Sequence, residues 1–204
     1  MKRLSFLLAI LIFVSEAAAV DFKIFGGASL SRSTEPLEGY WLEIYLVSQY
    51  GAGFVVGGGI EFTLTRNIAF EADVLFFQKG SGIEMRQRGD PVPDEVIGHS
   101  MERMNELSFP VLYRFYLKPG NSPYLLGGGE FAFVLSKAPD PNNYGLISQR
   151  TEYGLVFGAG LRKQIKGGYL SVEGRYNHGL QDMASDFSIL RKMRVFSVLV
   201  GLSF

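Results

Sequence analysis

Hydrophobic and polar residues alternate along most of this chain, in segments of about 10 to 14 residues. In the stretch FEADVLFF, Glu71 and Asp73 alternate with Phe70, Ala72 and Val74. A β-strand sends successive side chains to opposite sides, whereas no helical face of this stretch would be consistently polar. The pattern therefore predicts a strand with one apolar face and one polar face.

Eight segments share this pattern, and their number is even, as expected for antiparallel strands that close into a barrel. They cover residues 21–31, 52–65, 68–79, 103–117, 123–135, 150–163, 168–179 and 191–204.

Short and long links alternate between these segments. The short links are Arg66 with Asn67, the KPGNS sequence and the QIKG sequence, all of which carry turn-forming residues. The long links are polar and cover residues 32–51, 80–102, 136–149 and 180–190. This rhythm predicts an up-and-down barrel with short periplasmic turns, long extracellular loops and both chain ends on the periplasmic side. The YWLEIYLV sequence in the first long link is either a strand extension or a small lid.

The charges of the mid-strand positions fall on the polar faces, opposite large apolar residues. A soluble β-sandwich would place the charges outside and the apolar residues inside, and alternation alone does not separate the two architectures. The strand length, the aromatic apolar faces and the terminal Phe204 favour the membrane barrel. We therefore expect an all-β protein, an eight-stranded antiparallel up-and-down transmembrane β-barrel.

The first residues predict export. A basic MKR start, an apolar stretch and three alanines ending at Ala19 are typical of a secretory signal peptide. An uncleaved anchor is the alternative, but the apolar stretch is shorter than the roughly 20 residues of a spanning helix. We expect residues 1–19 to be the signal peptide and residues 20–204 to be the barrel domain, located in the bacterial outer membrane.

Composition narrows the chemistry. The formal net charge is zero, which gives no support for nucleic-acid binding. Cysteine is absent, so disulfides, thiolate metal sites and cysteine nucleophiles are excluded. The two histidines are far apart and no clustered Asp-x-Asp loop occurs, so neither a metal nor a cofactor is expected. The glycine runs at residues 57–59 and 127–129 lie in predicted strands, where they favour close strand packing over phosphate binding.

Charged residues of the polar faces should meet inside the barrel. This lumen charge cluster consists of Glu61, Glu71, Asp73, Arg114, Glu130, Glu173 and Arg175. An eight-stranded barrel is just wide enough for side chains, so these groups must pair or hold water. The main hypothesis is a polar core that closes the barrel. The alternative is a narrow ion path, which the excess of acids would make cation-selective, with Lys23 and Arg162 adding positive charge at the ends.

Several sequences resemble a known group: NELSFPVLYRFYL, YLLGGGEFAF, EYGLVFGAGL and RYNHGL are similar to the small bacterial outer-membrane β-barrel proteins. This group shares the architecture of the OmpX and OmpA barrels and includes a PorT-like branch. Its C-terminal strand implies an assembly signal that the barrel-assembly machinery reads. The alternating outward residues that match this signal are Phe196, Val198, Val200, Leu202 and Phe204.

The resemblance also bears on Pro110 and His178. Pro110 lies mid-strand and removes a ladder donor, and the family's tolerance of a proline here suggests a bulge. Lipid A deacylases are eight-stranded barrels with a His-x-Ser-Asn pattern. Leu180 and Gln181 stand at the Ser and Asn positions after His178, so the dyad is broken. His99 is expected in a loop.

The expected function is structural or surface-interacting, without catalysis, through the long loops. A narrow channel and a lipid A-modifying enzyme stay open as alternatives, and the PorT-like resemblance adds an accessory of assembly or secretion. Arg88, Gly89 and Asp90 form an integrin-type tripeptide that also suits an ordinary charged turn. Outer-membrane lipids, lipopolysaccharide and a surface ligand are the expected partners of a monomer.

Overall fold

The computed structural model describes residues 19–34, 44–87, 95–119, 122–137, 151–180 and 192–204, and these build a single antiparallel sheet. Its strands are β1 (Val20–Thr34), β2 (Ile44–Thr63), β3 (Ile68–Gln87), β4 (Glu95–Tyr116), β5 (Ser122–Lys137), β6 (Thr151–Ile165), β7 (Gly168–Gly179) and β8 (Lys192–Ser203). The described residues include no helix with the length and apolarity that a membrane crossing requires.

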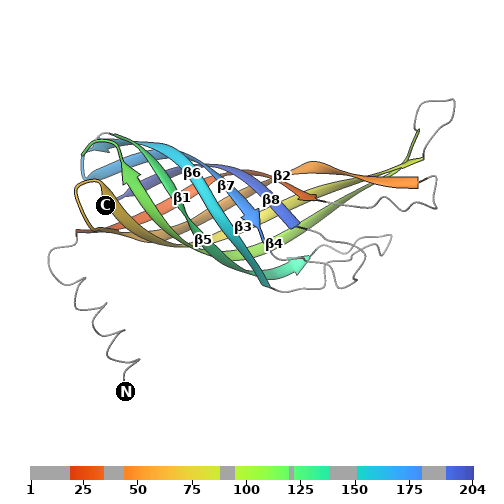
Figure 1. Ribbon diagram of the computed structural model, residues 1–204, viewed down its shortest axis with the longest axis horizontal. Helices are drawn as coiled ribbons and strands as arrows, with labels where there is room; N and C mark the ends of the chain where they lie inside the picture. The colour runs from red at the N-terminus through yellow and green to blue at the C-terminus, as the bar shows by residue number, and fades with distance from the viewer. Residues whose placement is uncertain (1–18, 35–43, 88–94, 120–121, 138–150, 181–191) are drawn as a thin grey trace, which may run out of the picture.

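The sheet closes on itself. Each strand pairs with the next one along the chain, and β1 also pairs with β8, from Lys23 opposite Ser203 to Thr34 opposite Lys192 (Figure 1). Closure removes the free edges that an open sheet would present. The expected fold, an eight-stranded antiparallel barrel with neighbouring strands joined in sequence order, is confirmed.

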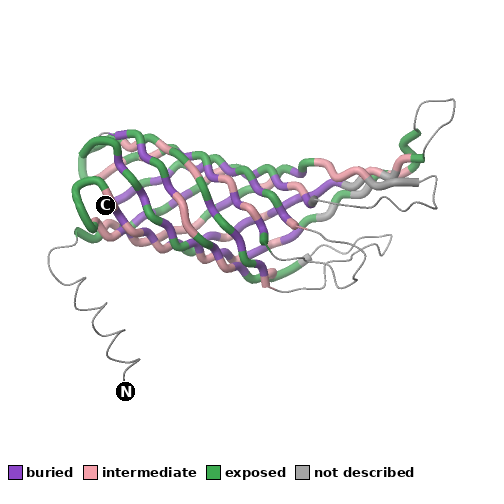
Figure 2. Tube along the Cα trace, in the orientation of Figure 1, coloured by how far each residue is buried: buried purple, intermediate pink, exposed green. Residues whose placement is uncertain are grey.

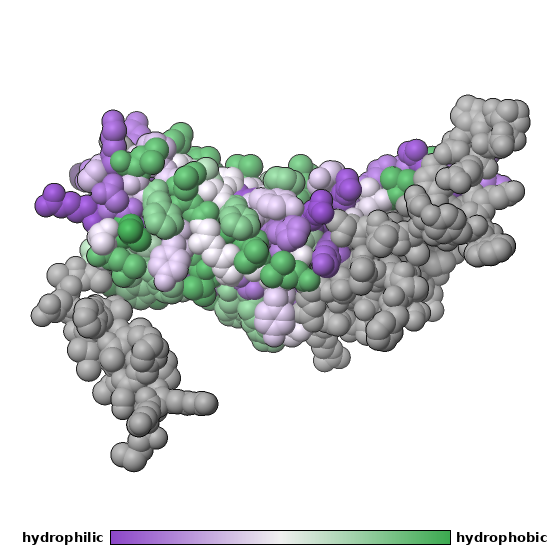
Figure 3. Space-filling model, viewed as in Figure 1, coloured by the Kyte–Doolittle hydropathy of each residue, from purple (hydrophilic) through white to green (hydrophobic). Residues whose placement is uncertain are grey.

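Burial alternates along the strands as the sequence pattern predicts. In β8 every second residue is buried, while Phe196, Val198, Val200 and Leu202 between them are exposed. The alternation recurs around the barrel (Figure 2), and the visible outer wall carries a band of hydrophobic residues (Figure 3). The wall therefore presents apolar side chains outward and directs polar ones to the interior.

One end of the barrel carries the short turns and the ends of both terminal strands (Figure 1). Between β6 and β7 the turn is only Lys166 and Gly167, and Gly167 has φ of 89°, which glycine adopts without steric cost. Between β2 and β3 the backbone nitrogens of Leu64 and Thr65 both donate to the carbonyl of Ile68. We call this end the turn end and the opposite end the loop end.

Three strands extend past the rest of the barrel at the loop end (Figure 1). The β1–β2 ladder stops at Ser31 opposite Gly51, and the β4–β5 ladder stops at Met104 opposite Lys137, while β2, β3 and β4 continue together. We call residues 44–50, 80–87 and 95–103 the loop-end extension.

The extension corrects two expectations. Most of the predicted loop 80–102 is strand, so His99 lies in β4 and not in a loop. The predicted loop 32–51 contributes its last residues to β2, which makes the described part of the YWLEIYLV sequence a strand extension. Gly80, Ser81 and Gly82 have low strand propensity, and only pairing with both neighbouring strands keeps them extended. The rest of YWLEIYLV, Arg88, Gly89 and Asp90 lie outside the described residues.

The expectation of a bulge at Pro110 is also wrong. The β3–β4 register is the same on both sides of the proline, with Ala72 opposite Val111 and Leu75 opposite Ser108. The two pairs between them are missing from the ladder. Pro110 still lies opposite Glu130 of β5, so the side without pairing faces β3. Because proline has no N–H, the wall has a gap in its hydrogen bonding without a change of register.

The lumen also contains apolar side chains. One inner cluster comprises Phe25, Val55, Leu75, Phe77, Val195 and Leu199. A second comprises Ala69, Leu112, Tyr116, Tyr124, Leu126 and Val156. These clusters fill space between the charged side chains, as the narrow bore of eight strands requires.

Candidate functional site

The inward-facing charges form the strongest candidate site of the described residues. All seven members of the sequence-derived lumen cluster are buried, with exposed fractions between 0 and 6%. They separate into two groups. Six of them join Lys23 and Arg162 toward the turn end, and we call these eight residues the lower cluster. Glu130 lies apart, toward the loop end.

Two arginines from facing walls hold the lower cluster together. Arg175 of β7 donates to Glu173 at 2.6 Å, to Asp73 at 2.8 Å and to Glu71 at 3.0 Å. Arg114 of β4 donates to Glu71 and to Glu173, both at 2.8 Å. Each arginine therefore connects β3 with β7 across the bore, which no backbone pairing does.

Lys23 of β1 completes the ring on the other side. Its ammonium donates to Glu71 at 2.6 Å and to Glu61. The lower cluster therefore contains four basic and four acidic side chains in one connected network. Burying charges is costly unless they are paired and hydrogen-bonded, and this equal count satisfies that condition.

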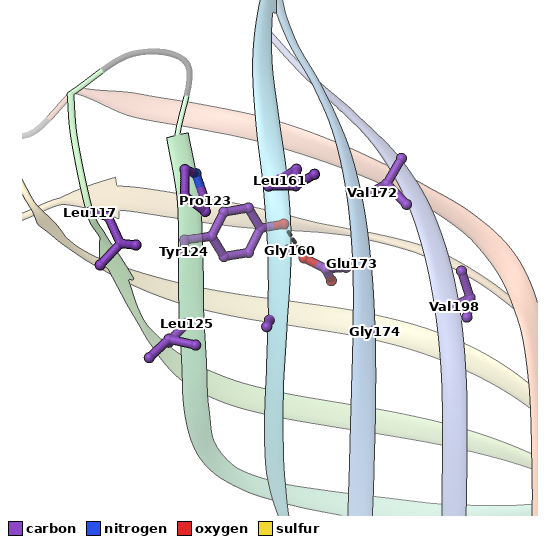
Figure 4. A pocket seen from close by; sticks show the side chains of 11 residues that line it. Leu117, Pro123, Tyr124, Leu125, Gly160, Leu161, Val172, Glu173, Gly174 and Val198 are labelled. Atoms are coloured by element: carbon purple, nitrogen blue, oxygen red, sulfur yellow. Dashed lines mark hydrogen bonds between the residues drawn. The ribbon is translucent and has the colours of Figure 1, made fainter.

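Two tyrosines satisfy remaining carboxylate oxygens. The Tyr116 hydroxyl donates to Glu61 at 2.7 Å, and the Tyr124 hydroxyl donates to Glu173 at 2.6 Å (Figure 4). The ring of Tyr124 lies over Gly160, where a Cβ atom would come within 2.5 Å of the hydroxyl oxygen. The absence of a side chain at Gly160 therefore makes room for the bond between Tyr124 and Glu173.

Arg162 lies toward the turn end of the lower cluster. Its guanidinium carbon is 3.8 Å from the ring centroid of Tyr116 and 4.4 Å from that of Tyr169. Its Nη1 atom is 3.5 Å from a carboxylate oxygen of Glu61. Cation–π stacking on these two rings therefore holds Arg162 inside the lumen at the turn end.

A smaller group lies toward the loop end. Lys79 donates to Glu106 at 2.7 Å and to Glu152 at 3.2 Å. Glu130 accepts hydrogen bonds from Ser108 at 2.9 Å and from Asn177 at 2.7 Å. We call Lys79, Glu106, Glu130 and Glu152 the upper cluster, which holds three acids and one base.

Sequence reasoning left Lys79, Glu106 and Glu152 out of its lumen cluster. Alternation gives a signal for all three, because Lys79 shares the parity of Glu71 and Asp73, and the polar faces of β4 and β6 include Glu106 and Glu152. Their position near predicted strand ends hid them, and for Lys79 and Glu106 the true strands run further than predicted. Tyr116 and Tyr124 give no such signal, because an inward tyrosine looks like any aromatic residue.

The other candidates lie outside this network. His178 is on the outer face, where its Nδ1 atom is 3.2 Å from the Tyr176 hydroxyl. Leu180 beside it is exposed, so the serine-like position carries no nucleophile. Phe196, Val198, Val200, Leu202 and Phe204 form the outward row of the last strand. The described residues contain no group of three or more His, Cys, Asp or Glu side chains that would hold a metal ion.

What the network can do is mechanical. It joins opposite walls through paired charges and gives each of its carboxylates a partner, as charges buried in a narrow bore require.

Comparison with known proteins agrees with this architecture. The barrel is similar to OprG from Pseudomonas aeruginosa, with a TM-score of 0.51, 15% identity, and coverage of 92% of this chain and 97% of that one. It is also similar to Ail from Yersinia pestis in complex with the heparin analogue sucrose octasulfate, with a TM-score of 0.47, 17% identity, and coverage of 91% and 99%. Neisserial surface protein A gives a TM-score of 0.48, 14% identity, and coverage of 90% and 97%. At these identities the likeness concerns the fold.

No curated protein matches the sequence. The family model described as "Outer membrane protein beta-barrel domain" matches residues 15–185, which is most of the chain. Closed barrel, apolar outer wall and family match together place the protein in the bacterial outer membrane. This chain belongs to the family of outer membrane protein beta-barrel domains.

Proposed function

We propose that this outer-membrane barrel is a non-catalytic surface-interaction protein whose lumen is closed and whose binding surface is the loop-end extension. The observation that carries the proposal is the continuation of β2, β3 and β4 past the last pairs of β1 and β5. The short turns, the start of β1 and the end of β8 lie at the opposite end (Figure 1), which barrels of this architecture place in the periplasm, so the extension is directed to the outside of the cell.

The extension has surface features that suit binding. Within the described residues, segments 44–50 and 95–103 pair only with β3, so each keeps one row of backbone groups outside the ladder. Val96, Ile97 and Met101 are about half exposed on β4. Unpaired strand edges with apolar side chains recognise extended polypeptides by strand addition.

The closed lumen supports the same proposal by disfavouring the channel alternative. The lower cluster, its two tyrosines and the inner apolar clusters occupy the bore. The outer face gives no support to an enzyme function, because the described hydrogen-bond partner of His178 is the Tyr176 hydroxyl.

Excision of the β3 and β4 parts of the extension tests the proposal. Residues 81–102 would be replaced by an Asn-Gly turn, since Ser81 lies opposite Glu102 in the ladder. Proteoliposomes carrying either form would be applied to immobilised extended polypeptides and to immobilised anionic polysaccharides. We expect the full protein to bind the polypeptides and the excised form to lose binding while keeping its heat-dependent gel mobility. Equal binding by both folded forms would contradict the proposal.

A further inference from the structure

Each of the three short turns at the turn end carries a basic residue. Arg66 lies in the β2–β3 turn, Lys118 in the β4–β5 turn and Lys166 in the β6–β7 turn. Lys163, near the end of β6, is a fourth base at the same rim. All four are exposed, and none of the three turns contains an acidic residue. The rim of the turn end, where Figure 3 shows hydrophilic residues, therefore carries four positive charges.

These four charges are not compensated within the described part of the chain. No ion pair between described residues includes Arg66, Lys118, Lys163 or Lys166. The nearby acid Asp21 lies opposite Glu61 in the ladder, on the lumen side, and its basic neighbours there are lumen residues. The rim bases are thus available to an anionic partner outside the barrel.

Aromatic side chains on the outer face show how deep these bases lie in the membrane. The rings of Phe62 and Phe70 are 6.3 Å apart, and those of Phe70 and Tyr113 are 5.6 Å apart, so the three form a row across β2, β3 and β4. Rows of this kind lie at the headgroup level of barrel proteins. The row therefore places the nearby turns at the membrane surface.

The apolar outer face continues from this row up to the bases. Leu117 is 65% exposed and directly precedes Lys118. Ile165 likewise precedes Lys166, and Leu64 lies two residues before Arg66. A base that follows the last lipid-facing residue reaches the phosphate groups with its long side chain.

The distribution of the bases favours a lipid surface over a protein partner. The three turns join six of the eight strands, so the charges are spread around the rim and not gathered on one side. A docked protein needs a compact patch with a buried centre, whereas headgroups surround a barrel on all sides. A lipid with net negative charge gains more from the bases than a zwitterionic one.

We propose that the turn end selects anionic phospholipids from the membrane leaflet that surrounds it. Arg66, Lys118, Lys163 and Lys166 bind the phosphate groups, and the adjacent apolar residues contact the acyl chains. This surface lies at the opposite end from the loop-end extension and takes a different partner, so it is independent of the proposed surface function.

Tryptophan quenching by brominated lipids tests the proposal in proteoliposomes. The single tryptophan would be removed as Trp41→Phe, and a reporter would be placed beside Lys118 as Leu117→Trp. The probes are phosphatidylglycerol and phosphatidylcholine with the same dibrominated chains, each mixed into unbrominated phosphatidylcholine. The ratio of their quenching gives the preference of the lipid sites near the reporter.

We expect phosphatidylglycerol to be preferred about fivefold at low salt, the effect of one base near a membrane surface. High salt should reduce this preference, because the charges are exposed. Lys118→Gln should bring the ratio close to one, while Lys118→Arg should keep it. The matched control is Lys137→Gln, an exposed base at the loop-end limit of β5, which should leave the ratio unchanged. Heat-dependent gel mobility verifies that each variant is folded.

Equal quenching by the two lipids in the barrel with all four bases would overturn the proposal. A preference that survives when Arg66, Lys118, Lys163 and Lys166 are all replaced by Gln would overturn it as well. If the bases bound soluble polyglutamate while the two lipids quenched equally, the rim would be a surface for acidic polypeptides, and the lipid assignment would be wrong.

Discussion

Arg175 shows how much of this barrel depends on a single side chain. It contacts three carboxylates within 3.0 Å, and it is 2% exposed. Such a group contributes mainly by neutralising its partners, since a buried carboxylate without a cation is very unfavourable. The second requirement at the residue scale is space for the side chains inside the barrel. Glycine at a few inner positions leaves that space.

Replacing Arg175 tests the charge balance. Arg175→Met should lower the free energy of unfolding by about 3–5 kcal/mol, because Glu71, Asp73 and Glu173 lose a shared partner. The control is Arg86→Met in the loop-end extension, where the side chain is 38% exposed and its pair with Glu84 is worth about 1 kcal/mol or less. Urea titration in lipid vesicles measures both. Similar small losses would show that the lumen is well hydrated.

Two glycines, one in β6 and one in β7, separate the effect of space from that of backbone conformation. At Gly160 a Cβ would come within 2.5 Å of the Tyr124 hydroxyl, whereas at Gly174 nothing lies within 4 Å. Gly160→Ala should therefore destabilise the barrel by about 1–3 kcal/mol, and Gly174→Ala should be neutral or stabilising. The same urea titration compares them. A neutral Gly160→Ala would mean that Tyr124 is free to move away from Glu173.

At the scale of the element, each strand has two different sets of residues, one facing the lumen and one facing outward. β8 has buried Val195, Ser197 and Leu199 on one side and exposed Phe196 and Val198 on the other. Strand parity makes these sets inseparable, because a register slip of one residue would exchange them. A hydrophobic outer face is suitable only where the surroundings are lipid.

A charge on the outer face of β8 tests its depth in the membrane. Val198→Lys, in the middle of the strand, should cost about 2–4 kcal/mol of folding free energy. Leu202→Lys, near the turn end, should cost about 1 kcal/mol or less. Vesicle refolding titrations give both values. Equal costs at the two positions would contradict the membrane placement of this strand.

At the scale of the whole molecule, the barrel is closed in two senses. Backbone pairing joins β1 to β8, and the lower cluster joins the walls across the bore. Under the proposed function, binding therefore belongs to the loop-end extension and not to the lumen.

Planar-bilayer recording tests the closed lumen. The refolded protein should give no steady conductance, and Glu130→Gln should change nothing, because ion pairs and tyrosines occupy the bore. A control barrel of known conductance verifies insertion. Cation-selective steps that shrink in Glu130→Gln would contradict this expectation and favour the narrow channel.

Alternation and link lengths in the sequence were enough to predict eight strands, their order, the closed barrel and the inner side for the seven charges of the lumen cluster. These features are local, since a strand's parity is a property of its own residues. The outer-membrane location followed from the same alternation together with the apolar outer face.

Other features were decided only by the tertiary structure. The sequence did not show that Glu130 belongs with Lys79 and not with Arg175, because the distance between side chains of different strands depends on register and on barrel tilt. Nor did it show that 80–87 and 95–103 are strands, since weak strand formers become extended only when neighbours pair with them. The gap at Pro110 is a further example. The proline is visible in the sequence, but whether it bends the strand or leaves backbone pairs missing depends on the strand opposite.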